Sequence, residues 1–366
     1  MKISVGNIFE SKAKTLVNTI NCVGIMGKGI ALEFKQKYPY MYKEYIALCN
    51  RKAIKPGEPY LYADLMSTSI INFPTKDHWK SPSKLSYIIN GLQWFKDNYD
   101  KLGIVSIAFP PLGCGNGGLS WDIVGPIMYE NLVNLPIEIE IYAPYGTASD
   151  KLTSAFLSKN YIHSTSDILG NKNIKFNDKW LLILYVVKKL SENRYVLNVG
   201  RTIFQKICYV LNSEGVNIGA VFTKGSYGPY SPQIKNIIMV LSNANLIIEK
   251  QLGQMISVEI TNKFSFDKNK YSIQELDAVE KTIDLFSRIK STEQAEIIAT
   301  VLFSYELIKK ENDKIMDKDI FNFVLNWKPK WKINNETIIN STIQNLAMLD
   351  WINVTPSKEM IESSYV

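Results

Sequence analysis

Residues 21–31 read Asn-Cys-Val-Gly-Ile-Met-Gly-Lys-Gly-Ile-Ala, and this stretch constrains the chain more than any other. It lies between a β-branched run at 15–19, which predicts a strand, and a pattern at 30–37 that predicts a helix. Glycines let backbone N–H groups approach an anion, and the amino end of a helix attracts negative charge. The junction therefore predicts a phosphate-binding loop.

A second glycine-rich segment, 110–119, reads Pro-Pro-Leu-Gly-Cys-Gly-Asn-Gly-Gly-Leu and follows the apolar run 104–109. Two such loops can hold a diphosphate. A dinucleotide-binding unit would have G-x-G-x-x-G after its first strand, whereas the predicted strand 2–5 leads into Gly6 and Asn7. A P-loop would end in Gly-Lys-Ser/Thr, whereas Lys28 is followed by Gly29. Both of these nucleotide-binding classes are excluded.

The composition is that of a globular protein with mild basicity. With 366 residues, 46% of them hydrophobic, the chain is expected to form two domains. No apolar run is long enough for a membrane span, and the first residues lack the regions of a signal peptide, which predicts a cytoplasmic protein. Four cysteines without C-x-x-C spacing and two histidines favour neither a metal site nor a disulfide framework. The formal net charge of +7 is compatible with nucleic acid.

Strand and helix patterns alternate through 1–148 and predict a three-layer α/β/α domain with a mixed sheet. The predicted strands are 2–5, 15–19, 60–64, 69–73, 103–108 and 138–142, and the predicted helices are 30–37, 41–50, 84–98 and 122–135. The alternation of Ile and Glu in 137–141 favours an edge or half-exposed strand.

The polar stretch 149–177 predicts a linker region with one short helix, and 178–366 predicts a mainly helical second domain. Its helices are expected at 180–190, 201–212, 232–243, 273–289, 293–310 and 336–349. A hairpin is expected at 246–250 and 255–261. Helices followed by a two-stranded wing suggest a winged-helix-like unit.

Four phrases of the first domain together resemble the motifs of macrodomains. They are Gly-Asn-Ile at 6–8, the loop at 21–31, Asn-Phe-Pro-Thr-Lys at 72–76 with Trp79 and Lys80 behind it, and the loop at 111–119. More narrowly, they resemble the ADP-ribosyl-hydrolase branch found in DarG-type antitoxins, whose toxins ADP-ribosylate thymine bases in single-stranded DNA. The resemblance implies hydrolytic removal of ADP-ribose from modified bases in single-stranded DNA, with thymidine as the implied base, and no cofactor or metal.

The resemblance also implies a set of residues around ADP-ribose. Asn7 would accept a hydrogen bond from the adenine amino group, and Asn21 would face the distal ribose, although asparagine is also common in plain turns. The expected contacts are Asn7, Ile8, Thr19, Asn21, Gly27, Gly29, Ile30, Thr75, Leu112, Gly113, Cys114, Gly115, Asn116, Gly117, Gly118 and Leu119.

Cleavage of the glycosidic bond needs a group that acts at the anomeric carbon, and no pair of carboxylates lies in these loops. In the branch that the chain resembles, a lysine after the fourth strand acts there, by attack on the sugar or by proton transfer, and the match carries this role to Lys80, with Asn21 as its catalytic companion. A reactive amine would need burial by Trp79 or the nearby charge of Lys76. A neighbouring subgroup has an aspartate where Asn116 stands, and its absence favours lysine-assisted hydrolysis.

Two further side chains near these loops are weaker candidates. His78 stands on a loop without an orienting carboxylate, so it is expected to face solvent. Cys114 lies between glycines, but the sequence places neither histidine to activate it. We predict that Cys114 is a wall residue of the second loop.

The second domain also carries a resemblance, to antitoxin-type helical domains, through 204–209 and the segment Lys-Gly-Ser-Tyr-Gly-Pro-Tyr-Ser-Pro at 224–232. The resemblance implies a cognate DarT-like toxin ADP-ribosyltransferase as partner, and Tyr227 and Tyr230 suit a protein interface. Two alternatives stay open: a non-catalytic ADP-ribose reader, and a DNA-binding regulator that uses the second domain. Lys206 is the only basic residue in 204–211, which disfavours a recognition helix there.

Overall fold

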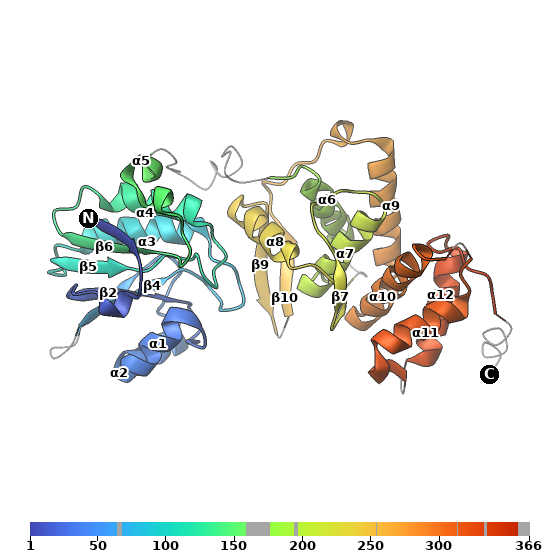
Figure 1. Cartoon of the computed structure of the whole chain (residues 1–366), viewed down its shortest axis with the longest axis horizontal. Coiled ribbons are helices and arrows are strands. Elements are labelled where there is room, and N and C mark those ends of the chain that lie inside the picture. Colours follow the sequence, from blue (N-terminus) through green and yellow to red (C-terminus); the bar gives the residue numbers. More distant parts are fainter. Residues whose placement is uncertain are drawn as a thin grey trace. The chain divides into compact units, whose positions relative to one another are not determined.

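The computed structural model describes residues 1–63, 68–158, 176–193, 197–253, 255–312, 314–332 and 335–357. The chain divides into two compact units, Met1–Phe176 with Ile238–Leu246, and Asn177–Ile237 with Ile247–Val366. We call them the N-terminal unit and the C-terminal unit (Figure 1).

A six-stranded mixed sheet forms the centre of the N-terminal unit (Figure 1). In spatial order its strands are β1 (Lys2–Val5), β6 (Glu138–Ala143), β5 (Ser106–Phe109), β2 (Thr15–Ile20), β4 (Ser69–Pro74) and β3 (Tyr60–Tyr62). All neighbours pair in parallel except β3, which runs antiparallel to β4. The carboxyl ends of the five parallel strands therefore lie along one edge of the sheet.

Helices cover both faces of this sheet. They are α1 (Gly29–Lys37), α2 (Pro39–Asn50), α3 (Leu85–Asn98) and α4 (Trp121–Leu132). Phe34 of α1 shares one hydrophobic core with Leu16, whereas Met128 of α4 shares a second core with Val17. Adjacent residues of a strand point to opposite faces, so these two cores lie on opposite sides of β2. The predicted three-layer α/β/α architecture is confirmed.

Of the two alternatives predicted for 137–141, the half-exposed strand is confirmed and the edge strand is wrong. β6 lies between β1 and β5, and the edges of the sheet are β1 and β3. Ile139 and Ile141 are buried, Glu138 is exposed, and the Glu140 carboxylate accepts a hydrogen bond from the Tyr142 hydroxyl at 2.9 Å. Glu140 therefore finds a polar partner within an interior strand, and the alternation of Ile and Glu did not mark an edge.

Other predicted boundaries in this unit also shift. The strand predicted at 103–108 begins only at Ser106, because Gly103 has a φ of +66° and belongs to a turn. The helix predicted at 122–135 ends at Leu132. The strand predicted at 60–64 ends at Tyr62, and residues 64–67 lie outside the described residues.

The first part of the expected linker packs on the N-terminal core. A 3₁₀ turn (Ser149–Leu152) and the short helix α5 (Ser154–Leu157) follow β6, and Leu157 is fully buried. The Trp121 indole N–H donates to the Lys151 carbonyl at 3.2 Å, and the Lys151 ammonium pairs with Asp122 at 2.8 Å. The N-terminal unit thus continues past residue 148, and 159–175 lie outside the described residues.

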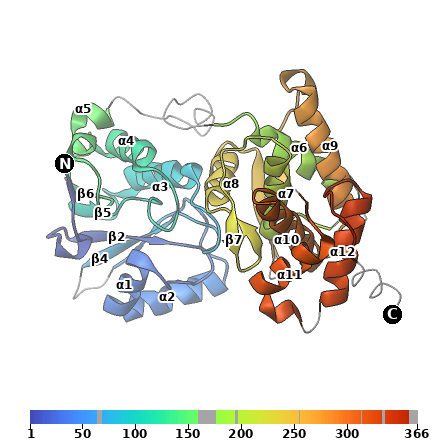
Figure 2. The same cartoon turned by 45° about the vertical axis from the view of Figure 1, so that its right-hand side comes forward.

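The C-terminal unit is mainly helical, as predicted (Figure 2). Its helices are α6 (Trp180–Ser191), α7 (Arg201–Ser213), α9 (Ile273–Ser287), α10 (Thr292–Lys309), α11 (Asp317–Trp327) and α12 (Glu336–Met348), and α8 (Gln233–Asn243) begins within it. The expected hairpin is formed by β9 (Ile247–Leu252) and β10 (Met255–Ile260). Helix α11 was not predicted, and neither was a short antiparallel ribbon of β7 (Thr223–Gly225) and β8 (Gly228–Tyr230).

Helix α10 is the central helix of this unit. Buried residues cover all its sides between Ala295 and Tyr305, as expected for a helix surrounded by others. It packs against α7, α11, α12 and β8. The ribbon formed by β7 and β8 therefore rests on the core of the unit.

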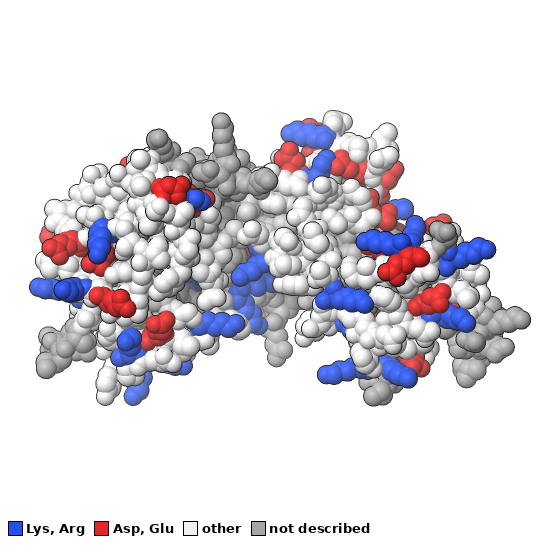
Figure 3. Space-filling model, viewed as in Figure 1, with Lys and Arg blue, Asp and Glu red and all other residues white. Residues whose placement is uncertain are grey.

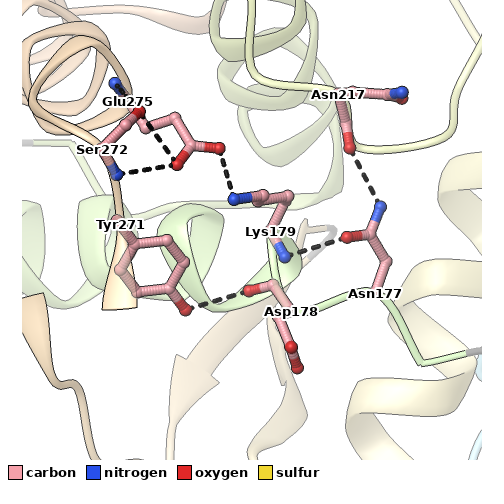
Figure 4. Close-up of polar contacts among 7 residues, drawn as sticks. All are labelled: Asn177, Asp178, Lys179, Asn217, Tyr271, Ser272 and Glu275. Carbon is pink, nitrogen blue, oxygen red and sulfur yellow. Dashed lines mark hydrogen bonds and ion pairs between the residues drawn. The ribbon is translucent and has the colours of Figure 1, made fainter. Parts of the chain in front are cut away.

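Polar contacts fasten the start of the C-terminal unit to α9 (Figure 4). The Lys179 ammonium pairs with the Glu275 carboxylate at 2.5 Å, and the Tyr271 hydroxyl donates to the Asp178 carbonyl at 3.1 Å. Glu275 also accepts from the Ser272 N–H, which completes a capping box at the amino end of α9. The segment that leads into α6 is thus held at two points.

The surface carries charges of both signs. On the face viewed in Figure 3, Lys and Arg are interspersed with Asp and Glu over the described part of each unit. Within the described residues, the helices are too short or too polar to cross a membrane.

Candidate functional site

The loops that the sequence singled out leave the same edge of the N-terminal sheet. The first glycine loop (21–29) follows β2, the connecting loop (75–83) follows β4, and the second glycine loop (110–119) follows β5. Because β2 lies between β5 and β4, these three loops start from adjacent strands. In parallel α/β sheets, ligands bind at the carboxyl ends of the strands.

Asn21 holds the first glycine loop in shape. Its side chain is buried, and its Oδ1 accepts from the N–H groups of Val23 at 3.0 Å and Ile25 at 3.3 Å and from the Tyr45 hydroxyl at 3.0 Å. Its Nδ2 donates to the Ile25 carbonyl at 2.5 Å. This asparagine therefore uses both ends of its amide inside the loop, and its predicted catalytic role at the distal ribose stays a prediction.

The first turn of α1 follows directly and offers backbone donors. Lys28, the N-cap residue, makes no side-chain capping hydrogen bond, and Gly29 is exposed with a φ of +57°. The first turn of a helix has N–H groups without intrahelical partners, and these groups favour anions. The structure thus supplies the donors that the glycine pattern predicted.

The second glycine loop is built against Ser83, a residue that the sequence did not single out. A side chain at Gly117 would overlap the Gly113 carbonyl and the Ser83 hydroxyl, and one at Gly113 would lie 2.9 Å from the Ser83 Cβ. A side chain at Gly115 would meet nothing within 4 Å. The base of the loop therefore requires glycine, whereas its tip is open.

The connecting loop joins the other two. On one side the Thr75 N–H donates to the Ile20 carbonyl, and the Cys22 N–H donates to the Asp77 carbonyl, both at 3.1 Å. On the other side the Ser83 N–H donates to the Gly117 carbonyl at 3.0 Å. All three loops are therefore one hydrogen-bonded assembly.

Lys76 reaches across this assembly. Its Nζ donates to the Asn116 carbonyl of the second glycine loop at 2.7 Å. A Cβ on Gly29, in the first loop, would lie 3.0 Å from the Asn116 Nδ2, so the two glycine loops approach each other at this residue. The Lys76 amine consequently lies where the loops meet.

Lys80, the lysine that the resemblance selected, contacts two neighbours in the connecting loop. Its Nζ lies 5.2 Å from the centroid of the Trp79 ring, which is itself 47% exposed, and its N–H donates to the His78 Nδ1 at 3.2 Å. The Lys80 side chain is exposed. Its predicted catalytic role stays a prediction.

The thiols near the loops are poor nucleophiles. Burial raises the pKa of Cys114 to about 12, and burial followed by the neighbouring Cys49 and Asp77 raises the pKa of Cys22 to about 12. At neutral pH both remain thiols, which supports Cys114 as a wall residue. Among the described residues, His, Cys, Asp and Glu do not gather in threes that could hold a metal ion.

Asn7 and Ile8 follow β1 at the same edge. Asn7 is exposed, and its Oδ1 accepts from the Phe9 N–H at 3.1 Å, which caps the 3₁₀ turn Ile8–Glu10. Ile8 is buried. Asn7 thus adopts the turn role that was its alternative reading, and its contact with adenine stays a prediction.

The other predicted contact residues fall into two groups that differ in solvent exposure. Those that are exposed or half-buried can meet a ligand: Thr19, Gly27, Gly29, Ile30, Cys114, Gly115, Asn116 and Gly118. Those that are buried shape the loops from behind: Thr75, Leu112, Gly113, Gly117 and Leu119. The individual roles stay predictions.

A buried asparagine pair beneath the first loop was also missed. Asn18 and Asn72 are register partners on β2 and β4, both fully buried, and the Asn18 Nδ2 donates to the Asn72 Oδ1 at 2.9 Å. The Asn18 Nδ2 also lies 4.0 Å from the Met26 sulfur of the first glycine loop. The sequence signal that could have revealed this pair was the presence of one asparagine in each of two otherwise apolar strands.

Comparisons with known proteins agree with this architecture. Residues 17–128 match the model of the Macro domain family. A Mycobacterium tuberculosis protein named DNA ADP-ribosyl glycohydrolase is 32% identical over 250 residues, which cover 65% of this chain and 66% of that protein. A Thermosipho africanus protein, named as a fusion of a DNA ADP-ribosyl transferase and a DNA ADP-ribosyl glycohydrolase, is 41% identical over 157 residues, which cover 38% of this chain and 40% of the fusion.

One solved structure, titled as the macrodomain of Thermus aquaticus DarG, is 40% identical and covers 39% of this chain and 97% of that chain, with a TM-score of 0.38. The chain spans 66% of the length of its mycobacterial relative. The matched residues 17–128 run from β2 into α4 and include all three loops at the carboxyl edge. Residues 17–128 belong to the macrodomain family, and the chain is similar over 250 residues to a protein named DNA ADP-ribosyl glycohydrolase.

Proposed function

We propose that the chain hydrolyses the N-glycosidic bond between ADP-ribose and a base of single-stranded DNA. The observation that carries the proposal is the position of the Lys76 amine, 2.7 Å from the Asn116 carbonyl, where the two glycine loops approach each other. The names of the relatives, DNA ADP-ribosyl glycohydrolase, supply the substrate class. The cytoplasmic location stays a prediction.

The diphosphate of ADP-ribose suits the two glycine loops. The exposed Gly27 and Gly29 precede or open α1, and Gly115 is open at the tip of the second loop. Backbone N–H groups in such loops bind anions without metal. A diphosphate held there would bring the distal ribose toward the meeting point of the loops.

At that point the reaction needs water to replace the base at the anomeric carbon, and the base to leave with a proton. The Lys76 amine is held against the second loop, so it can stabilise negative charge on the leaving base or transfer a proton to it. The second loop has Asn116 where an acid would be needed for release of a covalent lysyl intermediate, which favours direct hydrolysis.

The test uses the full chain and a thymidine-containing oligonucleotide that carries ADP-ribose, with release of ADP-ribose as the readout. We expect Lys76→Ala to slow turnover by roughly 100-fold or more while its affinity for ADP-ribose stays within about tenfold. Lys80→Ala, four residues along the same loop, is measured in parallel, because the resemblance assigns the catalytic role to Lys80. Turnover lost in Lys80→Ala and kept in Lys76→Ala would return the role to Lys80.

The same experiment separates the enzyme from an ADP-ribose reader. If the protein were an ADP-ribose reader, it would bind ADP-ribose and release none from the oligonucleotide. Wild type and both lysine variants would then give the same result. An ADP-ribosylated protein offered in parallel tests whether DNA is the substrate.

We also propose that the C-terminal unit binds a cognate ADP-ribosyltransferase toxin, so that the chain acts as an antitoxin. The Thermosipho africanus relative, whose name joins a transferase and a glycohydrolase in one chain, supports a physical link between the two activities. The alternative of a DNA-binding regulator is weakened, because Lys206, the basic residue of 204–211, is buried.

A further inference from the structure

The segment 226–230, which consists of the turn after β7 and strand β8 and which we call the tyrosine turn, presents two tyrosines on the C-terminal unit. Tyr227 is 71% exposed and Tyr230 is 50% exposed. Between them Gly228 and Pro229 are buried. The backbone of the turn thus lies inward while its two aromatic side chains lie outward.

Two buried lysines hold this turn from inside the unit. Lys206 of α7 is 2% exposed, and its Nζ donates to the carbonyls of Tyr227 and of Pro229, the latter at 2.9 Å. Lys328, at the end of α11, is buried as well, and its Nζ donates to the Ser226 carbonyl and pairs with Glu296 at 2.8 Å. Three carbonyls of one short turn therefore accept from ammonium groups.

Close packing adds to this hold. Gly228 has a φ of +79°, and a Cβ there would lie 2.7 Å from the Thr300 hydroxyl of α10 and 3.3 Å from the Lys206 Nζ. Gly225 is equally constrained, because a Cβ there would lie 2.7 Å from the Cβ of Tyr230. The turn has little room to adopt another conformation.

Stability alone does not explain this arrangement. Removing an ammonium from water costs several kcal/mol, and apolar residues of similar volume often serve a core at least as well. The two lysines instead fix the backbone that carries Tyr227 and Tyr230. Rigid tyrosines lose little conformational entropy on binding and are common anchors of protein interfaces.

The surroundings of the turn favour a protein with acidic groups. Lys224, opposite Pro229 in the ribbon, is exposed, and its Nζ lies 4.0 Å from the centroid of the Phe323 ring. Beyond α11, Lys330 is exposed too. The amines of Lys206 and Lys328 are occupied by carbonyls within the unit, which leaves them unsuited to bind phosphates of a nucleic acid.

We propose that the tyrosine turn is the surface through which the C-terminal unit docks on the ADP-ribosyltransferase toxin, an inference that rests on the proposed antitoxin function. The partner would offer two apolar pockets with an acceptor for each tyrosine hydroxyl, and acidic side chains opposite Lys224. Lys206 and Lys328 are positioning residues of this surface.

The test measures affinity between the full chain and the purified toxin by calorimetry. Tyr227→Ala and Tyr230→Ala should each weaken binding by about 30-fold or more, as truncated anchors do. Tyr40→Ala is the matched control, because Tyr40 is also 71% exposed but lies in the N-terminal unit. All three variants should release ADP-ribose from modified DNA as wild type does, so the hydrolase is judged separately.

A double-mutant cycle tests the positioning role. Lys206→Met should weaken toxin binding about tenfold in the wild-type background and much less in the Tyr227→Ala background, because it acts through Tyr227. Circular dichroism and the hydrolase assay report whether the variants fold. If Lys206→Met fails to fold, Gly225→Ala, which crowds Tyr230, takes its place in a cycle with Tyr230→Ala.

Three outcomes would overturn the proposal. The tyrosine variants could bind toxin as tightly as wild type, wild type could bind no toxin while it still hydrolyses modified DNA, or single-stranded DNA could bind with an affinity that depends on Tyr227. The last outcome would make nucleic acid the occupant of this surface.

Discussion

The second glycine loop and the tyrosine turn are both surface turns, and they expose different parts of the chain. Each is a short glycine-containing turn at a surface, and each has a backbone carbonyl that accepts from a lysine amine, Lys76 in one and Lys206 in the other. The glycine loop leaves Gly115 and Asn116 exposed, whereas the tyrosine turn buries its glycine and proline and exposes two tyrosines. The first can offer main-chain groups to a small anion, and the second offers side chains to a large partner.

The first test of this comparison is a substitution at the base of the second glycine loop. Gly117→Ala should lower the free energy of unfolding by about 3 kcal/mol or more, because its Cβ would overlap the Gly113 carbonyl and the Ser83 hydroxyl. Gly115 lies two residues away, and a Cβ there would meet nothing within 4 Å, so Gly115→Ala should change the free energy of unfolding by about 0.5 kcal/mol or less. Urea unfolding measures both, and equal stabilities would show that the loop adapts easily.

A second prediction concerns the asparagines. Asn21→Ala should lower the free energy of unfolding by about 2–3 kcal/mol, because it leaves the Val23 and Ile25 backbone groups without their side-chain partner, and it should weaken ADP-ribose binding. Asn7→Ala removes one exposed cap and should lower the free energy of unfolding by about 0.5–1 kcal/mol. If the two variants proved equally stable, Asn21 would not be the support of its loop.

The tyrosine turn adds a pH dependence. Burial, together with the nearby charge of Lys328, lowers the pKa of Lys206 to about 8 from the ordinary 10.5, and Glu296 opposes this shift. Between these values Lys206 is neutral in the folded chain and charged in the unfolded chain, so the unfolded state binds more protons and stability rises with pH.

We therefore expect wild type to gain roughly 1–2 kcal/mol of stability over Lys206→Met as pH rises from about 8 to about 10. Below pH 8 Lys206 is charged in both the folded and the unfolded chain, so the difference in the free energy of unfolding between wild type and Lys206→Met should be constant. Denaturant unfolding at several pH values measures it, and parallel curves for the two proteins above pH 8 would contradict the lowered pKa of Lys206.

The smallest effect is expected from metal removal. If backbone N–H groups bind the diphosphate, the affinity for ADP-ribose should be unchanged by a chelator. Calorimetry with and without the chelator checks this. An affinity that falls on chelation would mean that the glycine loops bind their anion through a cation.

Local patterns predicted most elements because each strand and helix of the sheet domain carries its own periodicity. The interior place of β6 was not visible, since strand order depends on pairings between distant segments. Helix α11 and the β7–β8 ribbon were missed, the latter because strands of three residues carry almost no pattern. Ser83 and Tyr45 support loops far away in sequence, and no motif marks such contacts.

The choice between Lys76 and Lys80 shows the same limit within one loop. Both lysines stand in a short polar segment, and only the path of the backbone decides which amine reaches Asn116. The resemblance located the loop, and the assignment of the catalytic role to one of the two lysines stays a prediction.

The interior position of β6 sets the order in which the N-terminal unit can assemble during synthesis. β1 occupies an edge of the sheet and pairs in register with β6, so Lys2 must wait for Glu140 to leave the ribosome. Until then β5 also lacks one neighbour, and two strand edges stay open in the growing chain. Contacts between such distant segments form slowly, and unpaired edges invite aggregation. The sheet that carries the three loops is therefore complete only when β6, its last strand in the sequence, has been made.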